Sequence, residues 1–379
     1  MNPIYQISAF GHTKHFTKEI NEALSKQLGE FGLSVGNEVV IDLNGSITSK
    51  NPKISAVGLF FGNDSKLAYT RPPALSDYDP IIPIVSSLER CSIELPTNVS
   101  AYNAMPSGGP NSPTRIAAAA IEALGLMPSR RRVFLSYRRN EARKAALQLF
   151  DELSERQFDV FLDTHEIRPG AVFQDVLWHH LSDCDVMLML DTTSYFKSRW
   201  TTEEFGQANL KKASILRIGY PGVVRDNNLS VTDTLALSDA DFTEDETFTA
   251  SALDRLADGV ERLRSKSVAV RQSNLVGSFR AAVKQFKGDL SGPGQLRRVL
   301  ATFPEGKELR VYPVVGVPTS EVVNRIVLDA EEHECALLYD NIGILQSWQE
   351  HLEWLGERVD RFHWIKAEAS YQALKGILG

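Results

Sequence analysis

Three segments in the middle of the chain carry side chains that could do chemistry, and each follows a short apolar run. The first contains two adjacent arginines, Arg138 and Arg139, whose guanidinium groups suit the oxygens of a pyrophosphate. The second runs from Asp163 to Phe173, and the third contains Trp200 and Glu204. If the third segment is helical, Trp200 and Glu204 lie one turn apart on one face. Together these groups could hold a phosphate-bearing ligand beside a carboxylate.

The pattern of apolar residues predicts how the three segments are brought together. Short apolar runs predict four strands, at residues 133–136, 158–162, 185–190 and 214–218. Apolar residues at helical spacing predict helices at residues 140–156, 174–182 and 199–212. Strands that are apolar on both faces form parallel sheets covered by helices on each side, and such sheets bind ligands beyond the carboxyl ends of their strands. The three segments should therefore line one crevice.

The composition limits the classes of protein to which the chain can belong. Its 43% hydrophobic and 23% charged residues are typical of a folded globular protein. A net charge of −7 disfavours nonspecific binding to nucleic acid, which needs an excess of lysine and arginine. There is no signal-peptide pattern, and no apolar run approaches the roughly 18–20 residues of a membrane helix. We therefore expect a cytoplasmic protein that does not bind membranes.

The cysteines and histidines predict neither disulfides nor a metal site. Three cysteines far apart, without Cys-x-x-Cys spacing, fit a reducing compartment. His165, His179, His180 and Cys184 are close in sequence, but their spacing matches no metal-ligand motif. The chain also lacks a P-loop and GxSxG, HExxH and GxGxxG motifs. We expect no metal ion and no cofactor.

Three sequence blocks in this region resemble those of TIR (Toll/interleukin-1 receptor) domains. Residues 133–140 resemble the opening strand of the family, and residues 161–173 resemble its second strand and the following loop. Residues 198–205 resemble the segment in which a tryptophan is followed four residues later by a glutamate. The blocks occur in the family's order. The resemblance implies an α/β fold of flavodoxin-like type with a parallel sheet.

The resemblance also implies a set of site residues. The family includes NAD⁺-cleaving enzymes, in which this glutamate is the essential carboxylate, and adaptor domains without catalysis. The role maps onto Glu204 rather than Glu203, because Trp200 fixes the register. The residues expected around the nucleotide are Tyr137, Arg138, Arg139, Phe173 and Trp200. Phe173 matches an aromatic residue that in related enzymes helps to form a pocket shared between subunits. Each of these side chains could instead have a packing or surface role.

A lone carboxylate is consistent with cleavage of the bond between nicotinamide and ribose. Nicotinamide leaves as a neutral group from a cationic ring, so no acid has to protonate it as in an ordinary glycosidase. The enzyme must hold the ribose and stabilise the positive charge that develops on its anomeric carbon, and a carboxylate such as Glu204 can do both. Capture by water gives ADP-ribose, and intramolecular capture gives a cyclic ADP-ribose.

Segments rich in proline and glycine divide the chain into three expected domains. Residues 106–113 place one boundary near residue 127, and the segment at 288–294 follows a second boundary near residue 275. The expected domains are residues 1–127, a TIR domain at 128–275, and residues 276–379. The flanking parts alternate strand and helix patterns, so we expect two further α/β domains that sense a signal or drive assembly. The first could be TIR-like, but it lacks the catalytic blocks.

Other elements are expected beside these boundaries. We expect strands in the flanking parts at residues 4–10, 39–42, 54–61, 81–85, 309–315, 336–339 and 361–365. Residues 251–264 and 274–286 predict two amphipathic helices, and the polar stretch 220–246 predicts a long loop or an irregular edge. Ser320 is expected to cap a helix that ends at Ala330.

The leading hypothesis is a bacterial-type TIR effector, an NAD⁺ glycohydrolase that becomes active on self-association into an oligomer or filament. Because uncontrolled loss of NAD⁺ is toxic, the enzyme should stay off until a small-molecule or protein trigger assembles it. Antiphage defence is the expected role. The alternatives are a cyclase that makes a cyclic ADP-ribose signal and a noncatalytic TIR scaffold.

Overall fold

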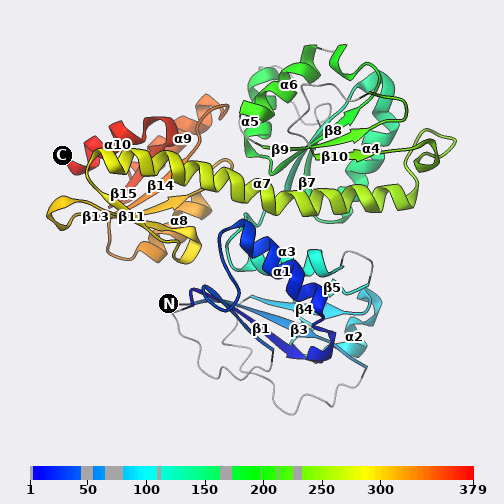
Figure 1. Cartoon of the computed structure of the whole chain (residues 1–379), viewed down its shortest axis with the longest axis horizontal. Coiled ribbons are helices and arrows are strands. Elements are labelled where there is room, and N and C mark those ends of the chain that lie inside the picture. Colours follow the sequence, from blue (N-terminus) through cyan, green and yellow to red (C-terminus); the bar gives the residue numbers. More distant parts are fainter. Residues whose placement is uncertain are drawn as a thin grey trace. The chain divides into compact units, whose positions relative to one another are not determined.

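The computed structural model describes residues 3–43, 54–64, 80–108, 112–162, 173–197, 199–210, 213–224 and 233–379. The chain divides into two compact units. Figure 1 shows the whole chain, coloured from the N-terminus to the C-terminus. The first comprises Met1–Ser129 and Gly294–Arg297, and the second comprises Arg130–Pro293 and Arg298–Gly379. The division after Ser129 lies close to the boundary that the sequence places near residue 127.

The first unit is built on a parallel sheet of order β2-β1-β3-β4-β5. Its strands are β1 (Tyr5–Gly11), β2 (Val39–Asp42), β3 (Ser55–Phe61), β4 (Ile81–Val85) and β5 (Met105–Pro106). Its helices are α1 (Lys18–Glu30), α2 (Cys91–Glu94) and α3 (Ser112–Ala123), with 3-10 turns η1 (Thr13–His15) and η4 (Leu88–Arg90). The expectation of an α/β fold is confirmed here. The sequence did not predict β5, which has only two residues.

The second unit begins with a sheet that is parallel throughout, the middle sheet. Its strands are β6 (Arg132–Ser136), β7 (Asp159–Leu162), β8 (Val186–Asp191), β9 (Ser214–Gly219) and β10 (Asp233–Ala236). The order β10-β9-β8-β6-β7 is that of flavodoxin-like folds, so the expected fold is confirmed. The sequence did not predict β10, because this short edge strand is largely exposed and has no apolar pattern.

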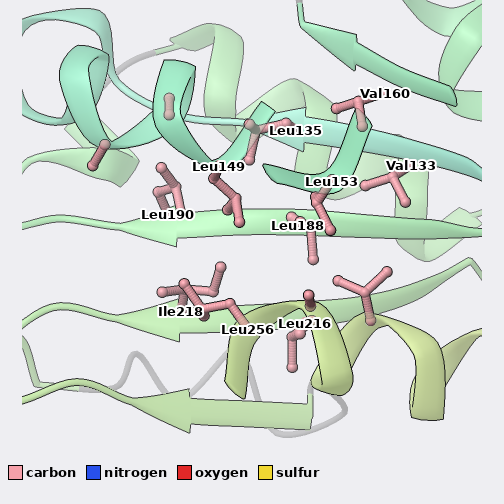
Figure 2. Close-up of a cluster of buried hydrophobic side chains, with 14 of the residues drawn as sticks. Val133, Leu135, Leu149, Leu153, Val160, Leu188, Leu190, Leu216, Ile218 and Leu256 are labelled. Carbon is pink, nitrogen blue, oxygen red and sulfur yellow. The ribbon is translucent and has the colours of Figure 1, made fainter. Parts of the chain in front are cut away.

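Helices cover both faces of the middle sheet. One face packs against α4 (Arg139–Glu155) and α7 (Ala250–Gln285), and Figure 2 shows Leu149 and Leu256 of these helices over the strands. The other face packs against α5 (Phe173–Asp183), α6 (Arg199–Leu210) and the 3-10 turn η5 (Tyr195–Lys197). Val133 and Leu135 point to the first face and Phe134 to the second, as alternation along a strand requires.

α7 is one helix of 36 residues, where the sequence predicted two. That prediction was wrong because the buried face of the middle of α7 is polar, which hides the helical periodicity of apolar residues. Arg264 pairs with Asp185 at 2.6 Å, and the Ser267 hydroxyl donates to the Asp185 carbonyl at 2.6 Å. Within the described residues, neither α7 nor any other helix has the length and apolarity needed to cross a bilayer.

The last sheet, β11-β12-β13-β14-β15, is mixed: β11, β12 and β13 are antiparallel neighbours, and β13, β14 and β15 are parallel. Its strands are β11 (Asp289–Ser291), β12 (Val299–Thr302), β13 (Glu308–Pro313), β14 (Cys335–Tyr339) and β15 (Phe362–Lys366), and its helices are α8 (Ser320–Ala330), α9 (Gln346–Gly356) and α10 (Ser370–Leu378). Its apolar core includes the C-terminal part of α7. Thr319 caps α8 by accepting from the Val322 amide, and Ser320 is the first helical residue, so the predicted cap is wrong by one position.

A cavity of about 240 Å³ lies between part of the middle sheet and elements that follow β13. His179 of α5 lines it, and Nδ1 of His179 accepts a hydrogen bond from the Leu345 amide at 3.3 Å. Burial, followed by repulsion from His180 and Arg132, lowers the pKa of His179 from 6.5 to about 4. The ring is therefore neutral at pH 7.

Replacement of Leu256 tests the packing of α7 on the middle sheet. Leu256→Ala should lower the free energy of unfolding by about 2–5 kcal/mol, because the change removes buried methyl groups and leaves a cavity. Leu328→Ala is the control: Leu328 is 70% exposed, and its replacement should change this free energy by less than about 0.5 kcal/mol. Urea unfolding followed by circular dichroism measures both. Equal midpoints for the two variants would contradict the packing.

Acid should destabilise the second unit through His179. The unfolded chain takes up the proton near pH 6.5 and the folded chain only near pH 4, so this contribution to stability is complete above pH 6.5 and is lost as the pH falls to about 4. His179→Asn keeps an acceptor for the Leu345 amide but does not titrate. Between pH 7 and pH 5 its thermal midpoint should fall less than that of the parent protein. Equal falls would rule out the buried neutral ring.

Candidate active site

A buried chain of three hydrogen-bonded side chains lies at the carboxyl end of β6. The Tyr195 hydroxyl lies 2.6 Å from the Ser136 hydroxyl, which donates to Oε2 of Glu204. Because the Ser136 proton goes to the carboxylate, Tyr195 is the donor to Ser136. Tyr195 is 0%, Ser136 2% and Glu204 3% exposed. An ionised carboxylate at this depth requires hydrogen-bond donors, and Ser136 supplies one.

The fold explains why these residues meet. Phe134 points to the face covered by α5 and α6, and Ser136, two residues later on β6, points to the same face. α6 crosses this face and carries Glu204, while η5 carries Tyr195. The Thr201 hydroxyl of α6 donates to the Tyr195 carbonyl, which joins η5 to α6. Three elements far apart in sequence therefore converge on one carboxylate.

The two adjacent glutamates of α6 have different surroundings. Glu204 reaches the end of β6 and is almost fully buried. Glu203 is half-buried, and its Oε2 accepts a hydrogen bond from Nε2 of Gln174 on α5 at 3.0 Å. The geometry therefore distinguishes Glu204, the residue that the Trp200 register selects, from its neighbour.

The two arginines after β6 also differ. Nη1 of Arg138 donates to the Ser194 carbonyl, and the Ser194 amide donates to Glu141 at 3.1 Å. Burial acts to raise the pKa of Glu141, but hydrogen bonds from the segment after β8 and the charge of Arg138 outweigh it and lower that pKa. These contacts fix the segment that precedes Tyr195. Arg139 is exposed at the start of α4, and contact of either arginine with a pyrophosphate stays a prediction.

The other predicted site residues are not brought to Glu204 by the described structure. Tyr137 is 5% exposed and packs in the core under α4 and α7, on the opposite face of β6 from Ser136. Phe173 begins α5, and Trp200 is the second residue of α6. The side chains of Phe173 and Trp200 and the loop 163–172 lie outside the described residues. Contact of these three residues with a ligand stays a prediction.

Some residues at the carboxyl edge were not assigned from the sequence. Ser136 gives a usable signal, because it is a hydroxyl residue at the end of an apolar strand. Tyr195 gives no such signal, because no spacing in the sequence relates it to Ser136, 59 residues earlier. An ion pair of Asp191 and Arg217 at 2.5 Å joins the ends of β8 and β9. Gly219 leaves room for it, because a Cβ there would lie 2.6 Å from Nη1 of Arg217.

Possible metal ligands and the cysteines are further titratable candidates for chemistry. Among the residues that the structure describes, no group of three or more His, Cys, Asp or Glu side chains is arranged to hold a metal ion. The three cysteines are free. Burial raises the pKa of the Cys184 thiol to about 12, so this cysteine does not supply a thiolate.

Comparison with known proteins bears on the middle of the chain. The family model described as TIR domain matches residues 133–257, which include Ser136 and Glu204. No curated protein matches the chain. A solved CMP N-glycosidase from Clostridium botulinum, BcmB, is 18% identical and is similar over 33% of this chain and 96% of its own, with a TM-score of 0.26.

Two other solved structures are more remote. The C-terminal domain of glucosamine-fructose-6-phosphate aminotransferase from Francisella tularensis is 12% identical over 71% of this chain and 84% of its own, with a TM-score of 0.21. A conserved domain protein from Vibrio cholerae is 10% identical over 86% of this chain and 98% of its own, with a TM-score of 0.20. TM-scores this low carry no functional argument.

Removal of the Tyr195 hydroxyl tests the buried hydrogen-bonded chain. Tyr195→Phe keeps the ring but deletes one buried hydrogen bond, so the free energy of unfolding should fall by about 0.5–1.5 kcal/mol. Tyr371→Phe is the matched control, because Tyr371 is 43% exposed and the same change there should have an effect below about 0.5 kcal/mol. Urea unfolding measures both. Equal free energies of unfolding for the two variants would argue against the buried hydrogen bond between Tyr195 and Ser136.

Proposed function

Residues 133–257 form a TIR domain, and we propose that it cleaves the bond between nicotinamide and ribose in NAD⁺, with Glu204 as the essential carboxylate. One observation carries the proposal: Glu204, at the position of the family's essential glutamate, is held at the carboxyl end of β6 by Ser136. NAD⁺ is then the substrate, and no other cofactor is needed.

The charge of Glu204 acts on the ribose as the bond breaks. The bonding electron pair goes to nicotinamide, whose ring loses its positive charge, and a positive charge develops on the anomeric carbon of the ribose. A carboxylate fixed beside that carbon stabilises the charge. Water then adds there and loses a proton, so NAD⁺ and water give nicotinamide, ADP-ribose and H⁺. Ser136 and Tyr195 act as positioning residues, because their hydrogen bonds restrict rotation of the carboxylate.

The burial of Glu204 supports activation by self-association. At 3% exposure, the carboxylate in a single chain is not accessible to a ribose. TIR domains generally self-associate, and an assembly that shifts α6 relative to β6 opens this position to substrate. An enzyme that is off as a single chain and consumes NAD⁺ once assembled suits a defence effector against phage.

The same burial also favours one alternative, a noncatalytic scaffold in which Glu204 is a structural carboxylate. Under that alternative no NAD⁺ turnover occurs, even when the chains are forced together by fusion to an oligomerising domain. A cyclase differs from a glycohydrolase in its product alone, and chromatography separates a cyclic ADP-ribose from ADP-ribose.

Glu204→Gln should abolish nicotinamide release. The amide keeps nearly the shape of the carboxylate but lacks its charge, so the rate should fall by about 10²–10³-fold or more. Glu203→Gln is the matched control, since it changes the adjacent carboxylate on the same helix and should retain most of the activity. Chromatography of nicotinamide measures turnover, and circular dichroism verifies that each variant is folded. Equal turnover by Glu204→Gln and the active parent would exclude Glu204 as the essential carboxylate.

A further inference from the structure

A second cavity, of about 250 Å³, lies beside the last sheet. α7 forms one wall, and the segments that follow β13, β14 and β15 form the others. The polar side chains in its lining are those of Arg271, Asn274, Ser278, Asp340 and Glu368, and Gly316 lines the wall after β13. The cavity therefore lies at the carboxyl ends of three neighbouring parallel strands, the edge at which α/β sheets bind ligands.

The strand side of the cavity presents hydrogen-bond acceptors. The Ile342 amide donates to Oδ1 of Asp340 at 3.0 Å, and Nδ2 of Asn341 donates to Oε1 of Glu368 at 3.0 Å, so both carboxylates are held in place. Acceptors of this kind suit a ligand that donates from hydroxyl or amino groups.

Charge and size limit the ligand further. The lining contains two carboxylates and one guanidinium. This guanidinium, of Arg271, already donates to two backbone carbonyls. The cavity therefore disfavours phosphate. Leu275 and Ile342 offer apolar contacts to a flat ring. The volume lies just below the range of about 300–1,000 Å³ typical of sites for drug-sized ligands. A nucleoside fits these limits, because acidic residues after strands bind ribose hydroxyls and its base can lie on the apolar side chains.

Two walls of the cavity also hold one segment of the TIR domain, Ser182–Cys184 at the end of α5. Arg271, which is 7% exposed, donates to the carbonyls of Ser182 at 2.9 Å and Cys184 at 2.6 Å. From the strand side, the Ile342 carbonyl accepts a hydrogen bond from the Ser182 hydroxyl at 3.1 Å. α7 and the segment after β14 therefore both form hydrogen bonds with Ser182–Cys184.

The wall after β13 approaches the same segment through Gly316. Its φ is +89°, and a Cβ there would lie 3.0 Å from Oδ1 of Asp183. The next amide, that of Val317, donates to this oxygen at 2.7 Å. Glycine alone tolerates both the left-handed backbone and the close approach, so this contact is built into the loop.

We infer that the cavity binds a phosphate-free nucleoside and that its occupancy is transmitted to Glu204 through α5. The C-terminal end of α5 is the segment that the cavity walls hold. Near its N-terminal end, Gln174 donates to Glu203, which precedes Glu204 on α6. A shift of Ser182–Cys184 therefore moves the helix that contacts α6. Regulation of turnover rests on the proposed NAD⁺-cleaving function, whereas the binding site does not.

Isothermal titration calorimetry tests the site on the full chain, with the four common ribonucleosides and their 5′-monophosphates. At least one nucleoside should bind saturably and more tightly than its monophosphate. Asp340→Asn and Glu368→Gln should each weaken binding about tenfold or more, because the acceptor loses its negative charge and its hydrogen bond to the ligand becomes weaker. Glu357→Gln, whose side chain is 77% exposed at the end of α9, should leave binding unchanged. Absence of binding by every nucleoside, or unchanged binding by both cavity variants, would overturn the site.

Hydrogen exchange tests the transmission. The nucleoside should slow exchange of the amides of α5 and of residues 182–185, both in the parent and in Glu204→Gln, and should change NAD⁺ turnover by the parent. Binding without any change at α5 would overturn the transmission while the site stands. A chain that binds the nucleoside and shows the exchange effect, but never turns over NAD⁺, would refute the proposed function and support this inference.

Discussion

The burial of one carboxylate constrains the whole carboxyl edge of the TIR domain. A carboxylate as buried as that of Glu204, which is 3% exposed, is tolerated in its ionised form only with hydrogen-bond donors around it. The end of β6 must therefore offer a small hydroxyl residue on the face toward α6, and Ser136 meets both conditions. Tyr195 and Thr201 then fix η5 against α6. The position of Glu204 and the order in the segment after β8 depend on the same few hydrogen bonds.

α7 imposes the second constraint. Its Arg264 and Asp185 of the middle domain form an ion pair whose side chains are 1% and 3% exposed, and removal of one partner of such a pair costs about 3–5 kcal/mol. Rotation or sliding of the helix would break this pair and leave both charges buried. The ion pair therefore fixes the start of β8 against α7, whereas the end of α5 is held by Arg271 through two backbone carbonyls. A signal from the last sheet reaches the TIR site most directly along α5.

The sequence predicts the parallel middle sheet well, because strands buried on both faces give apolar runs whose spacing shows the helices between them. It fails where the burial of an element does not match its pattern of apolar residues. β10 is an exposed strand, and the buried face of the middle of α7 is polar. In the site, the Trp200 register selects Glu204 over Glu203, and in the structure Glu204 is the glutamate that contacts Ser136 of β6. Alternation along β6 would also predict the side on which Ser136 lies. The place of Tyr195 depends on the packing of η5 against α6, which no spacing in the sequence encodes.

The first unit contains a second buried serine–glutamate contact, in a different electrostatic environment. Its sheet has the same strand order as the middle sheet, and its Glu94 is also 3% exposed and accepts hydrogen bonds from Ser86. Glu94, however, pairs with Arg90 of the preceding turn at 2.7 Å. A guanidinium this close offsets the field that a carboxylate would exert on a developing ribose cation. Glu94 is accordingly suited to holding the segment after β4, where it contacts Ser86.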